Sequence, residues 1–173
     1  MWRLNPRIRT ALALLAIAPA APAHASPVAP ARDATATVAM LHPLELIKRR
    51  DMDFGYVAPI AAGTVVLNPQ TDTISATGGA LLVGGSPHSA MFTGAAKNNA
   101  VVIIRIPKQP ILVTRSGGTE TMIVSKFTLQ GLDRRVIAAL TSFDFRVGAT
   151  LNVNANQAPG LYTGTFEVSV QYP

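Results

Sequence analysis

The sequence contains no cysteine, and charged residues make up only 14% of it. Without cysteine the chain has no disulfide, no thiolate metal site and no lipid-modified cysteine. The net charge of +6 includes three arginines within the first ten residues, so the rest of the chain is only weakly basic. A basic surface this dilute does not indicate nucleic acid as a partner.

The first 25 residues have the order of a cleavable secretory signal. A basic start is followed by an uncharged run over residues 11–23 and then by Ala23-His-Ala25. This pattern predicts cleavage after Ala25 and export to the periplasm, the cell surface or the medium. The apolar run is shorter than the ~20 residues that span a bilayer, so no transmembrane segment is expected after cleavage.

Residues 26–33 contain two prolines and little to bury, which predicts a flexible leader, and residues 34–173 are expected to form one domain. Short runs rich in Val, Ile and Thr alternate with Gly, Pro, Asn and Asp. This pattern predicts an all-β fold, an immunoglobulin-like or pilin-like β-sandwich of about 8 to 10 short strands. Residues 101–104 are expected to form a central strand buried on both faces, and residues 134–140 a helical turn. The pairs Gly78-Gly79 and Gly84-Gly85 are interpreted as hairpin turns.

The clearest pattern is at the C-terminus, after a turn at Pro159-Gly160. Alternate residues there are mostly apolar and the residues between them mostly polar, as in a strand with one buried face. The residues expected on the buried face are Tyr162, Gly164, Phe166, Val168, Val170 and Tyr172.

Residues 34–40 have the same two-residue period, with Ala34, Ala36, Val38 and Met40 on one face. This segment is either the first strand of its own domain, which is the simpler interpretation, or an extension that pairs with another chain.

The sequence offers few candidates for catalytic residues. His42 and His88 are the histidines left after signal cleavage, and the sequence around His88 does not match a nucleophile elbow. A polar turn is the preferred interpretation of His88. No enzyme activity is expected.

Asp51 and Asp53 share a strand face, but a cation site would need more oxygen ligands, so a solvated face is the preferred interpretation. The run Lys48-Arg49-Arg50 could meet an acidic glycan, although a charged turn or strand edge is the more common meaning. No cofactor or metal is expected.

Several motifs resemble a family of bacterial secreted domains catalogued as domain of unknown function 4402. They include Asp53-Phe-Gly55 and Pro159-Gly-Leu-Tyr-Thr-Gly164, and the likeness covers about residues 34 to 173. It implies a secreted β-rich domain without a known activity. The C-terminal strand is also similar to that of chaperone-usher pilus subunits, with Tyr172 penultimate and Gly160 fourteenth from the end. This second likeness implies binding of a periplasmic chaperone and of like subunits, although the cysteine pair of many pilins is missing.

These observations favour a non-enzymatic exported structural or adhesive protein, in the manner of a fimbrial subunit assembled by β-strand addition. Gly160 and the buried-face residues from Tyr162 to Tyr172 would carry the partner contact, together with residues 34–40. The alternative is a self-contained binding module for an acidic glycan or a protein partner, with loops carrying the contacts.

Overall fold

The computed structural model describes residues 44–138 and 142–173, and these two ranges form strands and no helix. The described strands are β1 (Glu45–Arg50), β2 (Tyr56–Asn68), β3 (Thr73–Gly84), β4 (Ala90–Ala95), β5 (Ala100–Arg105), β6 (Ile111–Arg115), β7 (Thr121–Leu129), β8 (Arg134–Ile137), β9 (Ser142–Val153), β10 (Tyr162–Thr163) and β11 (Ser169–Gln171). The predicted all-β sandwich is confirmed. In the described ranges no helix is long and apolar enough to cross a membrane. The predicted signal, the leader and residues 34–40 lie outside the described residues.

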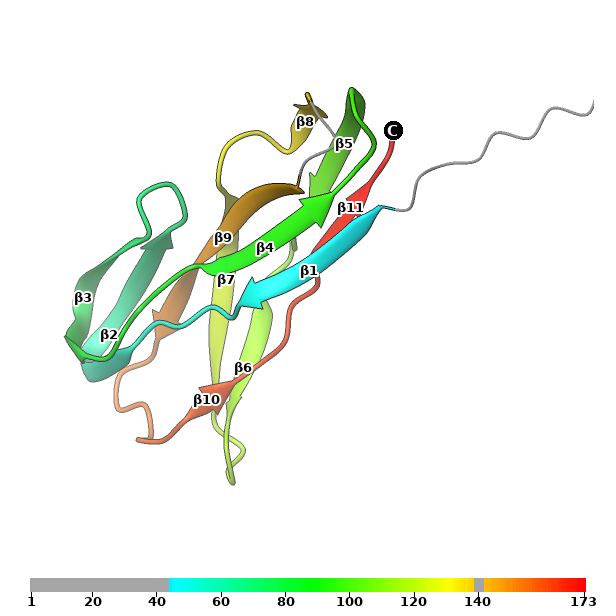
Figure 1. Cartoon of the computed structure of the whole chain (residues 1–173). Helices are drawn as coiled ribbons and strands as arrows, with labels where there is room; N and C mark the ends of the chain where they lie inside the picture. Colours follow the sequence, from blue (N-terminus) through cyan, green and yellow to red (C-terminus); the bar gives the residue numbers. More distant parts are fainter. Residues whose placement is uncertain (1–43, 139–141) are drawn as a thin grey trace, which may run out of the picture. The chain divides into compact units, whose positions relative to one another are not determined.

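Strand β9 is the centre of the larger sheet (Figure 1). Its first half pairs with β4 and its second half with β2, while β7 pairs along the opposite edge. The sheet continues from β4 to β1, from β2 to β3, and from β7 through β6 to β10. All of these pairings are antiparallel. One strand therefore positions both the β1–β4 pair and the β2–β3 hairpin.

Gly148 allows β9 to run without interruption. The sequence predicts two separate strands here, one on each side of Gly148, but the structure joins them. A Cβ atom on Gly148 would lie 2.1 Å from the carbonyl oxygen of Leu67. Glycine is therefore needed at position 148 because the backbone at Leu67 leaves no room for a side chain. It does not mark a turn.

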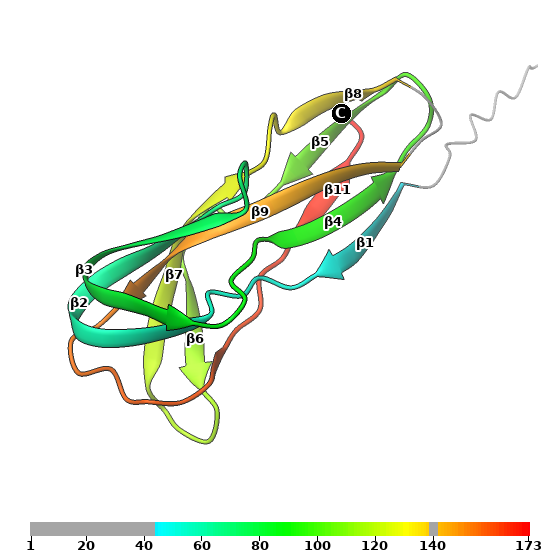
Figure 2. The same cartoon turned by 60° about the vertical axis from the view of Figure 1, so that its left-hand side comes forward.

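A smaller sheet, with the order β11-β5-β8, faces the β1, β4 and β9 part of the larger sheet (Figure 2). Apolar side chains fill the space between the two layers. Phe145 is fully buried there and stacks on Phe92, with ring centroids 5.4 Å apart. Val102 and Ile104 of β5 are buried on the opposite side. Strand β5 is central in its sheet, as predicted, but Val101 and Ile103 on its other face are only half-buried.

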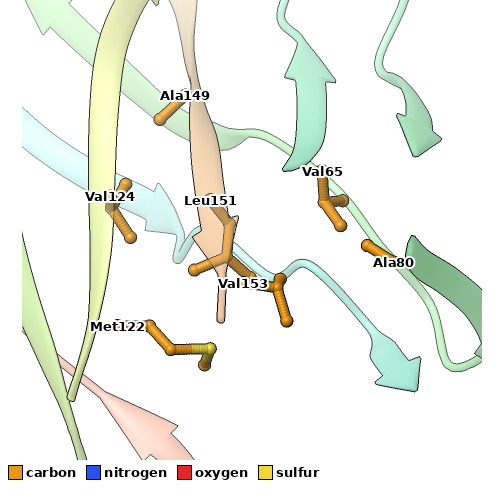
Figure 3. Packing of buried hydrophobic residues seen from close by; sticks show 7 residues of the cluster. All are labelled: Val65, Ala80, Met122, Val124, Ala149, Leu151 and Val153. Atoms are coloured by element: carbon orange, nitrogen blue, oxygen red, sulfur yellow. The ribbon is translucent and has the colours of Figure 1, made fainter. Parts of the chain in front are cut away.

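A second core lies where the larger sheet curls on itself (Figure 3). Strands β2, β3, β7 and β9 supply its buried side chains, which are Val65, Ala80, Met122, Val124, Ala149, Leu151 and Val153. Tyr162 of β10 packs against this cluster from the edge of the sheet. Buried residues of β9 thus belong to both of these cores, and a third, smaller cluster contains Ala96, Val102 and Ile137.

The turn between β2 and β3 is tied to the centre of the domain by Asp72. Its carboxylate accepts hydrogen bonds from Arg50 Nη2 at 2.6 Å and from the Ser89 backbone N–H at 2.7 Å, and Arg146 Nε lies 4.0 Å away. Burial, the largest single effect, raises the pKa of Asp72. The Ser89 and Arg50 hydrogen bonds together outweigh it and lower the pKa from 3.8 to about 2.

Two predictions about local structure are wrong. Residues 134–137, predicted as part of a helical turn, form strand β8, which pairs with β5. The Arg135 guanidinium helps to fix this segment, since it lies over the Phe145 ring and donates to the carbonyl oxygens of Leu132, Gln130 and Asp144.

Gly78-Gly79 lies inside β3 and is not a hairpin turn. Opposite this pair, β2 bulges between Pro59 and Gly63. A Cβ atom on Gly79 would lie 2.3 Å from the Cβ of Ala61, so glycine is required by the bulge.

Candidate functional site

The C-terminal segment, predicted as one continuous strand, is divided in two. Tyr162–Thr163 (β10) pairs with β6 of the larger sheet, and Ser169–Gln171 (β11) pairs with β5 of the smaller sheet. Between them, residues 164–168 face the longer stretch 106–113, which contains Pro107 and Pro110. Proline has no N–H to donate and the two stretches differ in length, so the ladder is interrupted there.

The alternation predicted for this segment is retained despite the interruption, except at Gly164, which was expected on the buried face. The half-buried side chains are Tyr162, Phe166, Val168, Val170 and Tyr172, and the remaining residues of the segment, Gly164 included, are exposed. Phe166 contacts the rings of Phe92 and Phe127, with centroids 6.5 and 5.3 Å away. One chain segment thus contributes side chains to the cores on both sides of the interruption.

Hydrogen bonds of two tyrosines fix the ends of the segment. The Tyr162 hydroxyl donates to the Ala158 carbonyl and accepts from Gln157 Nε2, both at 2.7 Å. The Tyr172 hydroxyl accepts from the Lys97 backbone N–H at 3.2 Å. Gly160, one of the predicted site residues, has a φ of +151° and packs against Arg115, so it shapes the entry to β10. These contacts hold the segment in place.

Strand β1, which the sequence analysis did not predict, lies on the same flank of the sandwich as β11 (Figures 1 and 2). Leu46 of β1 and Leu44, the residue before it begins, are half-buried and pack against the same cores as Val170 and Tyr172. The alternation of Leu44, Glu45 and Leu46 was an available signal. The first strand was expected at residues 34–40, and this obscured it.

Both strands of this flank have one edge with no strand partner within residues 44–138 and 142–173. Strand β1 pairs with β4 and β11 pairs with β5. Side chains from the inner strands are almost fully buried, with Phe92 8% and Ile104 2% exposed, whereas Leu46, Val168 and Val170 are only half-buried. We call the region between these two edges the β1/β11 flank.

The basic run on β1 is largely occupied by contacts within the domain. Lys48 forms an exposed ion pair with Asp51 at 2.6 Å, and Arg50 binds Asp72. Arg49 Nε donates to Thr93 Oγ1 at 3.0 Å. These three cations therefore lie on a charged strand edge, and each already has a hydrogen-bond or ion-pair partner within the domain.

The other predicted polar positions are structural. His88 and Asp53 exchange two backbone hydrogen bonds, and the Asp53 carboxylate accepts from the Gly55 N–H at 2.7 Å. His88 Nδ1 lies 2.5 Å from the Ser86 carbonyl oxygen. Within the described part of the chain no three His, Cys, Asp or Glu side chains are grouped so as to hold a metal. His42 lies outside that part.

A shallow hollow of about 380 Å³ lies where the C-terminal ladder is interrupted. Residues 105–111 line one side, and Thr165, Phe166, Glu167 and Ser169 line the other. Its two cations, Arg105 and Lys108, share it with the carboxylate of Glu167. The mixed charge does not define an anion site.

Comparison with known proteins identifies the family. The chain belongs to the family described as domain of unknown function DUF4402, whose model matches residues 44–172. No curated protein and no solved structure matched the chain. The matched range begins just before β1 and ends at Tyr172, so it spans both strands of the β1/β11 flank.

Proposed function

We propose that this member of the DUF4402 family is a non-enzymatic, exported structural subunit that assembles by β-strand addition at the β1/β11 flank. One observation carries the proposal. Leu46, Val168 and Val170 belong to the core between the layers, yet they remain half-buried beside two strand edges without a ladder partner in the described ranges. An extended strand laid along this flank would bury these side chains and pair with the free backbone groups.

Residues 34–40 supply the strand in this proposal. They precede β1 and place Ala34, Ala36, Val38 and Met40 on one face, with Thr35 and Thr37 on the other. Small and medium-sized apolar side chains suit the space beside half-buried residues. The segment either folds back onto its own β1 or enters the flank of a neighbouring copy, and assembly requires the second arrangement.

Export of the chain from the cytoplasm is the remaining part of the proposed function. The secretory signal over residues 1–25 would deliver the chain to the periplasm or beyond, where a periplasmic chaperone would cover the flank until a neighbouring copy replaces it. Mass spectrometry of the chain recovered outside the cytoplasm tests the first step. The expected N-terminal residue is Ser26, and a chain that remains in the cytoplasm with Met1 present would refute export.

Engineered cysteines distinguish the two arrangements, because the chain has no cysteine of its own. Thr37→Cys combined with Ser169→Cys would place one thiol on the donor segment and one on β11. Donation between copies predicts disulfide-linked multimers on a non-reducing gel. Folding back within one chain predicts only monomers with altered mobility. If neither bond forms, and Thr35→Cys with Ser169→Cys gives none either, residues 34–40 do not occupy the flank.

A matched pair of substitutions tests assembly itself. Val38→Asp introduces a charge on the inward face of the donor segment, whereas Thr37→Asp introduces the same charge on its outward face. We expect Val38→Asp to abolish a heat-sensitive ladder of multimers on gels and Thr37→Asp to retain it. Equal effects of the two variants, or a protein that is monomeric without any substitution, would contradict assembly by strand addition.

A further inference from the structure

The β2–β3 hairpin differs from the rest of the chain in its charge. Between Phe54 and Ala96, Asp72 is the only residue with a formal charge at neutral pH, and Arg50 already binds it. Strand β3 contains no charged residue and no proline. Within the described part of the chain it pairs with β2 alone, so its outer edge is free.

Large apolar side chains are exposed where β2 begins and β3 ends. Their exposed fractions are 70% for Tyr56, 74% for Ile60, 50% for Leu81 and 56% for Val83. The bulge in β2 between Pro59 and Gly63 contains Ile60. The result is an uncharged apolar surface beside an open strand edge, which we call the β3 edge. Exposed apolar surface of this kind marks contact sites.

Proteins usually protect exposed strand edges with charge, proline or short length. The described edge strands outside the β1/β11 flank follow this rule, since β8 carries Arg134 and Arg135 and β10 is only two residues long. Strand β3 has twelve residues without charge or proline, and its register shifts only near its end, where Val83 has no partner in β2. The unprotected edge is therefore a particular feature of this hairpin.

We propose that the β3 edge is a contact between two copies of this chain, paired antiparallel about a two-fold axis. The distribution of charge on the chain favours a second copy as the binding partner of the β3 edge. The chain is net positive, so two copies repel one another over most approaches, whereas two β3 edges can meet without like charges opposite each other. A charged protein or nucleic acid would gain no ion pair at this surface. A two-fold axis places the same strand on both sides, so an uncharged apolar edge is complementary to itself.

The location of the β3 edge keeps this contact separate from strand addition. The end of β3 lies at the opposite end of the described domain from the start of β1 and from the C-terminus (Figures 1 and 2). A dimer through β3 therefore leaves the β1/β11 flank open. The two contacts can exist together, and each can fail without the other.

Charged substitutions at exposed positions test the proposal with little risk to folding. Leu81→Lys with Val83→Lys would place four lysines across the paired edges of a dimer. Leu112→Lys with Val136→Lys is the matched control, since these residues are 60% and 67% exposed on β6 and β8. Like charges placed opposite one another across an interface strongly disfavour association. We therefore expect a loss of at least ~100-fold in dimer affinity from the first pair and a change within about twofold from the control.

Sedimentation over a range of concentrations measures the dimer, and hydrogen exchange locates it. Both are carried out on the purified unaltered chain and in the Val38→Asp background, where strand addition is blocked. We expect a dimer in both, with amides of residues 80–84 protected more strongly as concentration rises. A monomer up to about 1 mM, equal losses from the two lysine pairs, or protection elsewhere than β3 would overturn the proposal. Binding of lipid vesicles by a chain that stays monomeric without them would also overturn it.

Discussion

Asp72 offers a direct test of how the β2–β3 turn is stabilised. Its pKa is lower in the folded chain than the ordinary value of 3.8, at about 2, so protonation favours the unfolded state as the pH falls. The carboxylate therefore stabilises the fold fully above about pH 5 and loses this effect as the pH falls through 3.8 towards 2. A pKa difference of this size corresponds to about 2 kcal/mol.

Asp72→Asn removes this charge with little other change. The residue has a φ of +56°, a conformation that asparagine tolerates well, so no backbone strain is added. The variant leaves Arg50 and Arg146 without their carboxylate. Near pH 7 we expect its free energy of unfolding to be lower than that of the unaltered chain by about 2 kcal/mol. The difference should shrink towards zero near pH 2, because the carboxylate is then increasingly protonated in both states.

Urea unfolding followed by circular dichroism, repeated between about pH 7 and about pH 2, measures this difference. Asp51→Asn is the control, because Asp51 forms an ion pair with Lys48 in which both side chains are mostly exposed. That variant should change stability by less than ~1 kcal/mol. A deficit of Asp72→Asn that stays constant over the whole pH range would refute the role assigned to the ionised carboxylate.

Three further predictions follow from packing and charge. Gly148→Ala would force a Cβ against the Leu67 carbonyl, so we expect a loss of about 3 kcal/mol in urea unfolding, and a loss near zero would contradict the close approach. Phe145→Ala empties a fully buried site, and calorimetry should show a loss of about 3–5 kcal/mol; a smaller value would mean that the core collapses around it. Glu120→Gln removes a solvent-screened partner of Arg115, so the urea midpoint should stay unchanged at both low and high salt, and a salt-dependent drop would contradict this.

The sequence was sufficient for the fold class because the signal is local. Alternation of apolar and polar residues predicts strands, and from Tyr162 to Tyr172 it holds at every predicted buried-face position except Gly164, even where the backbone ladder is broken. Which strands pair with one another could not be predicted from such a local pattern. Which strand lies opposite residues 164–168 depends on the length of the segment between β5 and β6, and nothing in the C-terminal pattern records it.

Glycine residues were the least reliable indicator of turns and strand boundaries. Gly78-Gly79 was interpreted as a hairpin turn and Gly148 lay between two expected strands, yet they lie inside β3 and β9. In each case another segment approaches so closely that a side chain has no room, and this neighbour is distant in sequence or set by a bulge. Only one of the two strands of the β1/β11 flank was predicted from the sequence. Its C-terminal strand was recognised by pattern, whereas the short alternation at the start of β1 was overlooked, and the packing of Leu46 on the same core as Val170 is visible only in the structure.

The divided C-terminal segment also bears on how the chain is made. Residues 162–171 join β6 of one sheet and β5 of the other, and Phe166 between them reaches the aromatic core. Among the described strands, β10 and β11 are synthesised after all the others. Until they leave the ribosome, β5 and β6 each lack a neighbour and the rings of Phe92 and Phe127 lack a contact. The domain therefore closes only after residues 162–171 have been synthesised, and a chain without them would lack these contacts whatever its other strands had formed.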